Sequence, residues 1–343
     1  MPAQTSLPRT VAAAWGVQLL TALGADGARA TETVEHLLAA EDAGHPSHGL
    51  RMLRSIAAEV EQGHLDPTAT PVLELVSGSV ARVDGRMGLG PPIGRFATTE
   101  AVRLAQIHGT SAVAVRAAGH MGRLAPYAEM AAERGYALFM CANDGGANQC
   151  VVPAGGHEGR LSTNPIAFGI PRCAPPHLVV DMATSAYAHG TLGALDEAGG
   201  PLPDDALLAG GDSLLLPLGG HKGFALGLVV EALAGALTGA GVVSDVEPPE
   251  SQGALIVAIH FAAFGSPMDA TRDVDAAIAW VRTASSTDGS PIRIPGENRI
   301  AGAGAEVAIA ARLWGSLVEL SDRLGVRPPD PHEPRIGEHD ASA

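Results

Sequence analysis

The longest apolar stretch of the chain, from Gly223 to Gly241, limits the possible fold more than any other feature. Its nineteen residues (GFALGLVVEALAGALTGAG) are enough to cross a bilayer as a helix. However, Glu231 lies at the centre of the stretch, and an ionised carboxylate inside a membrane is costly. The stretch therefore predicts a buried helix of a globular protein, and we expect no membrane partner.

The rest of the composition agrees with a folded core and disfavours several classes of protein. Hydrophobic residues make up 46% of the 343-residue chain, which is enough for one large core or two moderate ones. Lys and Arg total 22 against 37 Asp and Glu, so nucleic acid is not an expected partner. The three cysteines form no CxxC pair, and the N-terminus lacks the pattern of a signal peptide. Both observations predict a cytoplasmic protein.

Beyond Pro67, short apolar runs alternate with helical patterns, which is typical of the α/β class. The periodicity predicts helices at 31–43, from about 49, and at 125–134, 222–237, 274–284 and 306–324. It predicts strands at 111–116, 137–142, 177–180, 254–260 and 291–294. A Rossmann GxGxxG fingerprint is absent, because Gly88–Gly94 has the wrong spacing and Gly302–Val307 lacks the third glycine.

The segment HPSHG (45–49) comes directly before a predicted helix. Its residues alone leave three possible roles for His48, which are metal binding, proton transfer and packing. His48 lies near a helix N-terminus, where unpaired backbone N–H groups favour a bound anion. A metal site is disfavoured, because His45 and His48 lack the i, i+4 spacing of HExxH and a nearby third ligand. Proton transfer by His48 and simple packing of a hydrogen-bonded ring both remain open.

Three further segments place reactive side chains at the ends of predicted elements. In GHMGR, Gly119 and Gly122 allow backbone N–H groups to approach a phosphate and Arg123 adds charge, although an ordinary tight turn is the alternative. Asp181 ends a predicted strand, where it either orients a histidine or caps the next helix. Lys222 opens a predicted helix, from which it can reach a phosphate or a carboxylate.

Taken in order, six segments resemble the malate/L-lactate dehydrogenase family of the non-Rossmann type. This family includes malate, ureidoglycolate, sulfolactate and diketogulonate dehydrogenases and the piperideine/pyrroline-2-carboxylate reductases. The resemblance runs from about residue 10 to residue 325. The segments are HPSHG (45–49), GHMGRLAPYAEMAAERG (119–135), VVPAGGHEGRLSTNPIAFGIP (151–171), VVDMATS (179–185), LLPLGGHKGFALGLVVEALAGALTGAG (215–241) and IPGE (294–297).

The resemblance implies an α/β, non-Rossmann NAD(P)-binding fold, in which a sheet domain packs on a helical domain built from both chain ends. It also implies a homodimer that acts on a small-molecule substrate. The expected parts are a helical segment 1–75, an NAD(P)-binding α/β domain 76–285, a return to the helical domain at 286–326 and a tail at 327–343. The proline-rich, polar composition of this tail predicts that it is mobile.

The resemblance also assigns roles to individual residues. Ser47 and His48 match the catalytic serine and histidine, Asp181 matches their acidic partner, and His120 matches a second histidine in the nicotinamide pocket. Cofactor contacts match His120, Met121, Gly122, Arg123, Leu124, Pro171, Arg172, Cys173, His221, Lys222, Pro295, Gly296 and Glu297. The cofactor is NAD or NADP, since the family lacks the acidic ribose-binding residue that distinguishes them in Rossmann proteins. No metal is expected.

These roles are consistent with the chemistry of hydride transfer to or from a 2-keto acid, a 2-hydroxy acid or a cyclic 2-imino acid. Hydride arriving at a C=O or C=N carbon calls for a proton at the heteroatom, which an imidazole such as His48 can supply. A substrate carboxylate is expected at the helix N-terminus near Gly49. The alternative is a non-redox use of the same scaffold, either a binding protein or an isomerase or cyclase that uses His48 and His120.

Two features depart from the family pattern. Many relatives have an arginine that binds the substrate carboxylate four residues after the catalytic histidine, where this chain has Met52. Arg51 or Arg54 is the candidate replacement, although on an ideal helix they point roughly 100° and 200° away from position 52. The segment 190–210 is also shorter than in relatives, which suggests a specialised substrate or a changed activity.

Overall fold

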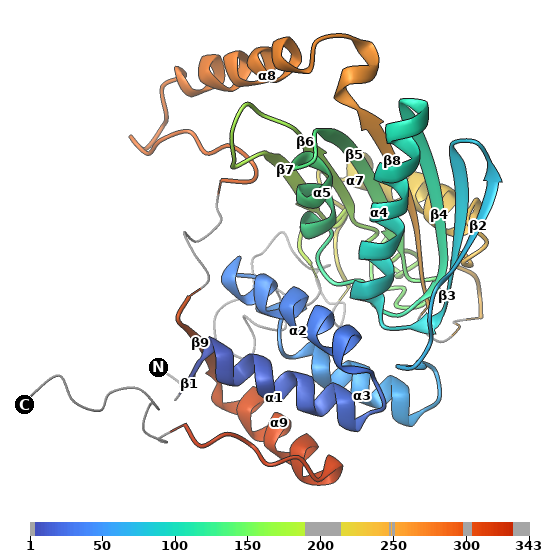
Figure 1. The fold of residues 1–343 in the computed structure, drawn as a ribbon, viewed down its shortest axis with the longest axis vertical. Coiled ribbons are helices and arrows are strands. Elements are labelled where there is room, and N and C mark those ends of the chain that lie inside the picture. The colour runs from blue at the N-terminus through green and yellow to red at the C-terminus, as the bar shows by residue number, and fades with distance from the viewer. Residues whose placement is uncertain (1–3, 189–213, 247, 249–250, 298–303, 332–343) are drawn as a thin grey trace, which may run out of the picture.

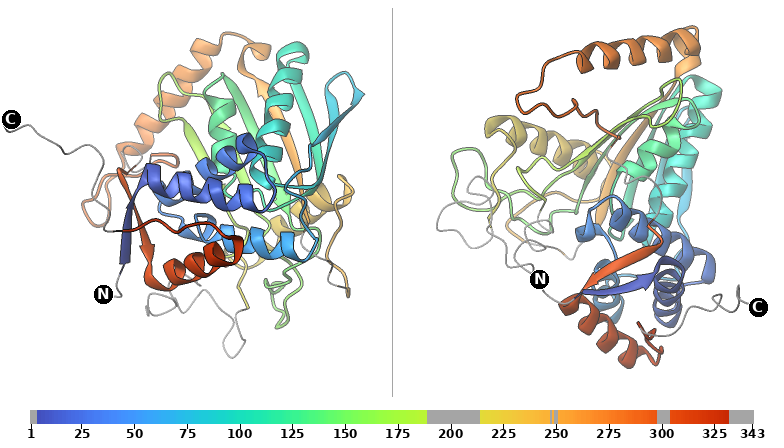
Figure 2. Two further views of the ribbon diagram at one scale, coloured as in Figure 1. Left: turned by 60° about the horizontal axis from the view of Figure 1, so that its bottom comes forward. Right: turned by 90° about the vertical axis from the view of Figure 1, so that its left-hand side faces the viewer.

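The computed structural model describes residues 4–188, 214–246, 248, 251–297 and 304–331 (Figure 1). The described residues form a seven-stranded sheet with helices on both faces and a separate group of helices beyond one end of the strands (Figures 1 and 2). The segment 190–210, which the sequence predicts to be shorter than in relatives, lies outside the described residues. Most of the tail 327–343 is likewise outside them.

The large sheet is mixed, and this distinguishes it from a Rossmann sheet. Only β3 and β4 pair in parallel, whereas every other pair of neighbours is antiparallel. The missing GxGxxG fingerprint therefore agrees with the topology, because that motif belongs to parallel βαβ units. In spatial order the strands are β2 (Val72–Ser77), β3 (Val80–Gly88), β4 (Thr110–Ala118), β8 (Gln252–His260), β5 (Tyr136–Asn143), β6 (Ile166–Ile170) and β7 (Leu178–Met182).

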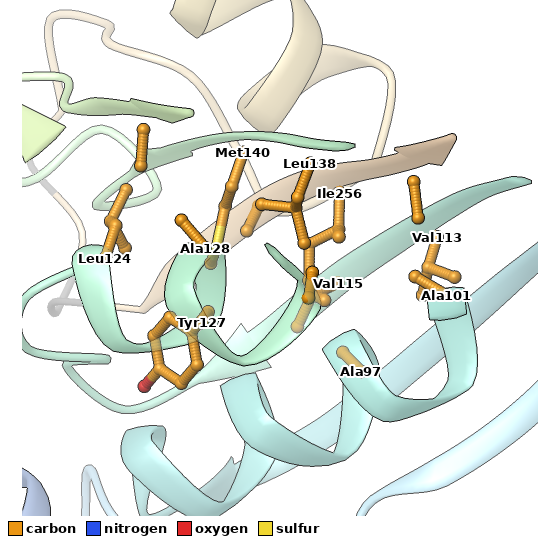
Figure 3. Close-up of a cluster of buried hydrophobic side chains, with 14 of the residues drawn as sticks. Ala97, Ala101, Val113, Val115, Leu124, Tyr127, Ala128, Leu138, Met140 and Ile256 are labelled. Atoms are coloured by element: carbon orange, nitrogen blue, oxygen red, sulfur yellow. The ribbon is translucent and has the colours of Figure 1, made fainter. Parts of the chain in front are cut away.

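Both faces of the sheet are covered, which explains why its central strands are almost continuously apolar. Helices α4 (Gly90–His108) and α5 (Ala125–Ala132) cover one face, and Figure 3 shows part of the cluster between them and the strands. Leu124 and Tyr127 lie at one end of this cluster (Figure 3). Helix α7 (His221–Val230) covers the other face, against a second cluster that contains Cys141.

The helical group is built from both ends of the chain. It contains α1 (Arg9–Ala22), α2 (Gly27–Asp42), α3 (Met52–Glu61) and α9 (Ala311–Leu324), together with the antiparallel strands β1 (Gln4–Pro8) and β9 (Glu306–Ala310). These elements share one buried hydrophobic cluster. Within it, Trp15 Nε1 donates a hydrogen bond of 2.8 Å to Ser321 Oγ, which joins α1 to α9.

The apolar stretch with Glu231 folds as a helix of the globular protein. Among the described residues, no helix is long and apolar enough to cross a membrane. Helix α7 ends at Val230, and Glu231–Ala236 continues it as a π-helical turn. Glu231 is 5% exposed and accepts hydrogen bonds from Asn164 Nδ2 at 2.9 Å and from the Val243 N–H at 3.2 Å. Its carboxyl group is therefore buried with hydrogen-bond donors of the protein around it.

Most predicted elements are present, but two of the predictions are wrong. Residues 291–294 form no strand. Pro291 lacks the N–H that a strand would donate. Ile294 is also the first residue of a turn, in which the Glu297 N–H donates to the Ile294 carbonyl at 3.1 Å. Residues 306–310 form β9 instead of a helix, since Val307 and Ile309 alternate inward against β1. The predicted helix at 274–284 is part of the longer α8 (Pro267–Arg282), which follows the short turn Phe261–Phe264.

Candidate active site

A cavity of about 810 Å³ contains the candidate catalytic residues. Both the sheet with its loops and the helical group contribute side chains to its wall. From the helical group come His45, Ser47, His48, Arg51, Met52 and Ser55. From the sheet and its loops come His120, Gly122, Arg123, Leu124, Ala142, Asp144, Asn148, Gln149, Cys150, Ser162, Thr163, Pro165, Asp181, Met182, Ala183, Ser185, Ala186, Tyr187, Ala188, Leu214, Leu218 and Gln252.

Ser47 and His48 occupy a single 3₁₀ turn, Pro46–His48, between α2 and α3. The turn is closed by a hydrogen bond of 3.0 Å from the His48 N–H to the His45 carbonyl. Ser47 is buried, and its Oγ lies 2.9 Å from His48 Nδ1. The hydroxyl therefore holds one edge of the imidazole and leaves the Nε2 edge for another partner. This contact supports the predicted pairing of Ser47 with His48.

His48 faces His120 across the cavity, with ring centroids 5.6 Å apart and planes inclined by 40°. Burial lowers the pKa of His48 to about 3, and the neighbouring imidazoles of His120 and His45 add to this effect. His48 is therefore neutral near pH 7, because its folded-state pKa lies far below that value. In this state one ring nitrogen can accept a hydrogen bond.

His120 belongs to the loop between β4 and α5, and the loop backbone determines which ring nitrogen carries its proton. The Gly122 N–H donates a hydrogen bond of 3.0 Å to His120 Nδ1. Because Nδ1 acts as the acceptor, the proton of the neutral ring is on Nε2. His120 thus offers an N–H donor, whereas His48 offers an acceptor.

Asp181 lies near the end of β7, as predicted, and its hydrogen bonds go to a helix. Its Oδ2 accepts a hydrogen bond of 2.8 Å from the Ala125 N–H at the start of α5. The same oxygen lies 4.0 Å from Arg123 Nε. Burial raises the pKa of Asp181, while the Ala125 N–H and the Arg123 guanidinium oppose that rise. The carboxylate therefore fixes the Arg123–Ala125 backbone rather than capping the segment that follows it in sequence.

The expected anion site at the start of α3 is occupied by the protein itself. Glu41 Oε1 accepts a hydrogen bond of 2.8 Å from the Leu50 N–H. A Cβ at Gly49 would lie 2.0 Å from the same oxygen, so glycine is needed for this approach. Burial raises the pKa of Glu41, and its hydrogen bond to Leu50 opposes the rise. The prediction that a substrate carboxylate rests near Gly49 is therefore wrong.

The residues near Met52 differ in their access to the cavity. Arg51 and Met52 both line it, together with Ser55. Arg51 is the residue directly before α3 and has helical backbone angles, with φ −57° and ψ −28°. Arg54 lies outside the lining and is exposed to solvent. Of the two arginines proposed to replace the missing family arginine, Arg51 is thus the one that can contact a ligand in the cavity.

The remaining residues predicted to contact the cofactor fall into separate groups. Met121 is fully buried in the core, although His120 and Gly122–Leu124 line the cavity. His221 and Lys222 are exposed at the start of α7 and lie outside the lining, close in sequence to Leu218, which belongs to it.

The segments 171–173 and 295–297 lie together at the opposite end of β6 and β7 from Asp181. The Val179 N–H donates to the Pro295 carbonyl at 3.4 Å, which joins the turn to the start of β7. Arg172 Nε is 2.6 Å from Asp275 Oδ1, and its Nη1 is 3.3 Å from Glu297 Oε1. Hydrogen bonds to Asp275 raise the pKa of Arg172. The structure brings these two predicted segments together, but places them outside the cavity lining.

Sequence reasoning missed two residues near the cavity. Gln252, the first residue of β8, accepts a hydrogen bond of 2.8 Å from the Met121 N–H, and the predicted strand began two residues too late to include it. His36 lies on the buried face of α2. The sequence signal that could have identified it is a histidine placed among the apolar residues of that face. Among the described residues, no group of three or more His, Cys, Asp or Glu side chains could hold a metal ion.

Two neighbouring imidazoles in a cavity between the sheet and the helical group are suited to acid–base chemistry. Residues 8–308 match the family described as malate/L-lactate dehydrogenase. The chain is 32% identical over 326 residues to an L-lactate dehydrogenase of Cupriavidus necator, covering 88% of this chain and 92% of the relative. It is 36% identical over 219 residues to a Delta(1)-pyrroline-2-carboxylate/Delta(1)-piperideine-2-carboxylate reductase of Pseudomonas syringae, covering 60% of this chain and 62% of the relative.

A crystal structure of malate dehydrogenase from Entamoeba histolytica superposes with a TM-score of 0.87, at 23% identity, over 96% of this chain and 100% of that one. At this identity the superposition establishes the fold. Together with the match over residues 8–308, it shows that the chain belongs to the malate/L-lactate dehydrogenase family. The protein is accordingly an oxidoreductase of that family, and the predicted fold class is confirmed.

Proposed function

We propose that this protein transfers hydride between a nicotinamide cofactor and a small 2-keto acid, 2-hydroxy acid or cyclic 2-imino acid, with Ser47, His48 and His120 as its catalytic residues. The facing pair of His48 and His120 carries the proposal. Their ring centroids are 5.6 Å apart, one ring is a proton acceptor and the other an Nε2–H donor. Named relatives that reduce or oxidise hydroxy acids and cyclic imines support the same substrate classes.

The chain's own residues account for the proton chemistry of such a reaction. In the oxidative direction, neutral His48 accepts the hydroxyl proton of the substrate while the His120 Nε2–H stabilises the developing carbonyl oxygen. For Nε2 to accept this proton, the neutral ring carries its own proton on Nδ1, which donates to Ser47 Oγ 2.9 Å away. In the reductive direction His48 returns a proton to the oxygen or nitrogen of the substrate, and the substrate carboxylate stabilises its charged form.

The cavity residues fit a nicotinamide cofactor. The cavity volume of about 810 Å³ exceeds the need of a small acid alone and lies within the usual range for ligand pockets. Gly122 and Arg123 both line the cavity, and Arg123 adds positive charge beside the loop backbone. When bound, the cofactor accepts or supplies the hydride at the substrate carbon. Either NAD or NADP is compatible with this proposal.

Arg51 is the proposed anchor for the substrate carboxylate. It lines the cavity next to Met52, on the same wall as His48. The start of α3 cannot bind this carboxylate, because Glu41 already accepts the Leu50 N–H. Met52 adds an apolar surface where many relatives are expected to have an arginine. A substrate with an apolar group next to its carboxyl-bearing carbon matches this pairing of Arg51 and Met52.

The direct test is an assay of the purified protein with NADH and with NADPH, following the loss of reduced-nicotinamide absorbance. Pyruvate, oxaloacetate and piperideine-2-carboxylate are the substrates in this direction. Ureidoglycolate, a 2-hydroxy acid, is assayed with NAD and NADP by the gain of the same absorbance. Each assay is run on the wild type and on the His48→Gln variant. We expect turnover of at least one substrate by the wild type, and a fall in kcat of roughly 100-fold or more in the variant while cofactor affinity is kept. If neither cofactor binds in calorimetry, the proposed function is wrong.

The proposal includes a homodimer in the cytoplasm. The outward side of α7 and its continuation exposes Leu226, Leu228, Val229 and Leu237, with 37% to 65% of each side chain accessible. An apolar surface of this kind on a helix is typical of a subunit interface. Cys141, Cys150 and Cys173 form no disulfide with one another, which suits a reducing compartment. Light scattering should give twice the chain mass of 34.8 kDa.

A further inference from the structure

His48 and His120 belong to different parts of the molecule, so their spacing depends on contacts between those parts. His48 follows α2 in the helical group, whereas His120 is in a loop of the sheet. Each part has its own hydrophobic cluster. A hydrogen bond or polar contact across the boundary is needed to hold the two rings in one arrangement, since apolar packing alone has little directional preference.

His36, on α2, makes such a contact beneath the His120 loop. Its ring is about nine-tenths buried and stacks on Tyr127 with centroids 5.2 Å apart and planes inclined by 26°. It also makes a hydrogen bond with the Arg123 backbone that favours its protonated form, so the ring donates and the Arg123 carbonyl accepts. Among the described residues, Nε2 of His36 has no hydrogen-bond partner, so the donor is Nδ1.

The unpartnered Nε2 of His36 lies directly against the loop. A Cβ at Gly122 would be 2.6 Å from this nitrogen, which means that the ring touches the Gly122 main chain. Gly122 is the residue whose N–H donates to His120 Nδ1. His36 therefore contacts Gly122, whose N–H sets the His120 tautomer, and the carbonyl of Arg123, which is the next residue.

Several other contacts join the loop to the sheet. Gln252 accepts the Met121 N–H at 2.8 Å, and the Tyr127 hydroxyl donates to the Met121 carbonyl at 2.7 Å. Asp181 accepts the Ala125 N–H at 2.8 Å. These contacts fix the loop relative to the sheet. They do not fix it relative to α2, which leads into the Ser47–His48 turn.

We infer that His36 is a positioning residue, which ties the His120 loop to α2 through its Nδ1–H and its contact with Gly122 and so sets the His48–His120 arrangement. It touches neither the proposed substrate nor the cofactor and acts through the loop. Its effect on turnover rests on the proposed function, but its effect on the tautomer of His120 does not.

The test compares two substitutions at this position. In His36→Asn the side-chain amide nitrogen occupies nearly the position of Nδ1, so it can still donate to the Arg123 carbonyl. In His36→Leu the volume is largely kept but the donor is lost. Proteins labelled with ¹⁵N at histidine give ring-nitrogen spectra that distinguish the two neutral tautomers, and the His120 signals are assigned by their loss in His120→Gln.

We expect wild type and His36→Asn to show His120 with its proton on Nε2, and His36→Leu to show a mixture of tautomers. With an active substrate, kcat of His36→Leu should fall at least 10-fold with little change in KM, and His36→Asn should recover most of it. The inference is wrong if His36→Leu keeps the wild-type His120 spectrum, or if both variants lose the Nε2–H tautomer equally. An inactive wild type would count against the proposed function, while the spectra would still decide the role of His36.

Discussion

Acid should destabilise this protein through its buried histidines, and the effect can be divided between two of them. The pKa of His48 is lowered to about 3 and that of His36 to about 4, in both cases mainly by burial. In the unfolded chain each ring has an ordinary pKa near 6.5. The folded state therefore binds fewer protons than the unfolded state between these values, and stability falls as pH drops below 6.5.

The size of the loss follows from the two shifts. At about pH 5 an unfolded histidine is almost fully charged, whereas both folded rings remain largely neutral. Each histidine then contributes a loss of about 2 kcal/mol relative to about pH 7.5, since one pKa unit corresponds to 1.36 kcal/mol. The pair together should lower the free energy of unfolding by about 4 kcal/mol, before carboxylate effects that all variants share.

Urea unfolding at the two pH values measures this loss for wild type, His48→Asn and His36→Asn. Asparagine does not titrate, so each variant should lose about 2 kcal/mol less than wild type between about pH 7.5 and about pH 5. A double variant should lose about 4 kcal/mol less. If wild type and the single variants lose stability in parallel, the rings are not held neutral in the folded state and the reasoning is refuted.

Three further predictions concern single contacts. Glu41→Ala should reduce the free energy of unfolding by about 1–2 kcal/mol, because Leu50 loses its acceptor, and Glu41→Gln, which keeps an acceptor oxygen, should lose less. Gly122→Ala should lower kcat strongly, because Gly122 has a φ of +71° and an added Cβ would collide with the His36 ring. A variant that loses stability but keeps its kcat would contradict this prediction. Val229→Glu should give a monomer in light scattering, and a variant that remains dimeric would exclude this face of α7 as the interface.

The fold could be predicted well where periodicity was strong. The predicted strands at 111–116 and 137–142 are the middle of β4 and β5, which are long and central in the sheet. The strand β9 was mistaken for helix, because its five residues are followed directly by α9 and the two patterns merge. Strand β1 is equally short, and its pairing partner lies at the other end of the sequence.

The site could be predicted to the level of segments but not of contacts. The matches at Ser47, His48 and His120 identified residues that meet in the cavity. The position of Glu41 could not be foreseen, since it depends on how α2 and α3 cross at the Pro46–His48 turn. A carboxylate is attracted to a helix N-terminus wherever the fold brings the two together. Their separation in the sequence does not predict whether they will meet.

The pairing of β1 with β9 has a consequence for how the chain folds as it is synthesised. Gln4 pairs with Ala310, so β1 cannot form its strand pair until almost the whole chain has been synthesised. The seven-stranded sheet needs nothing beyond His260 and can form earlier. We therefore expect the Ser47–His48 turn, which rests on the helical group, to become ordered last. A chain truncated before β9 should retain a folded sheet but lack a working pair of histidines.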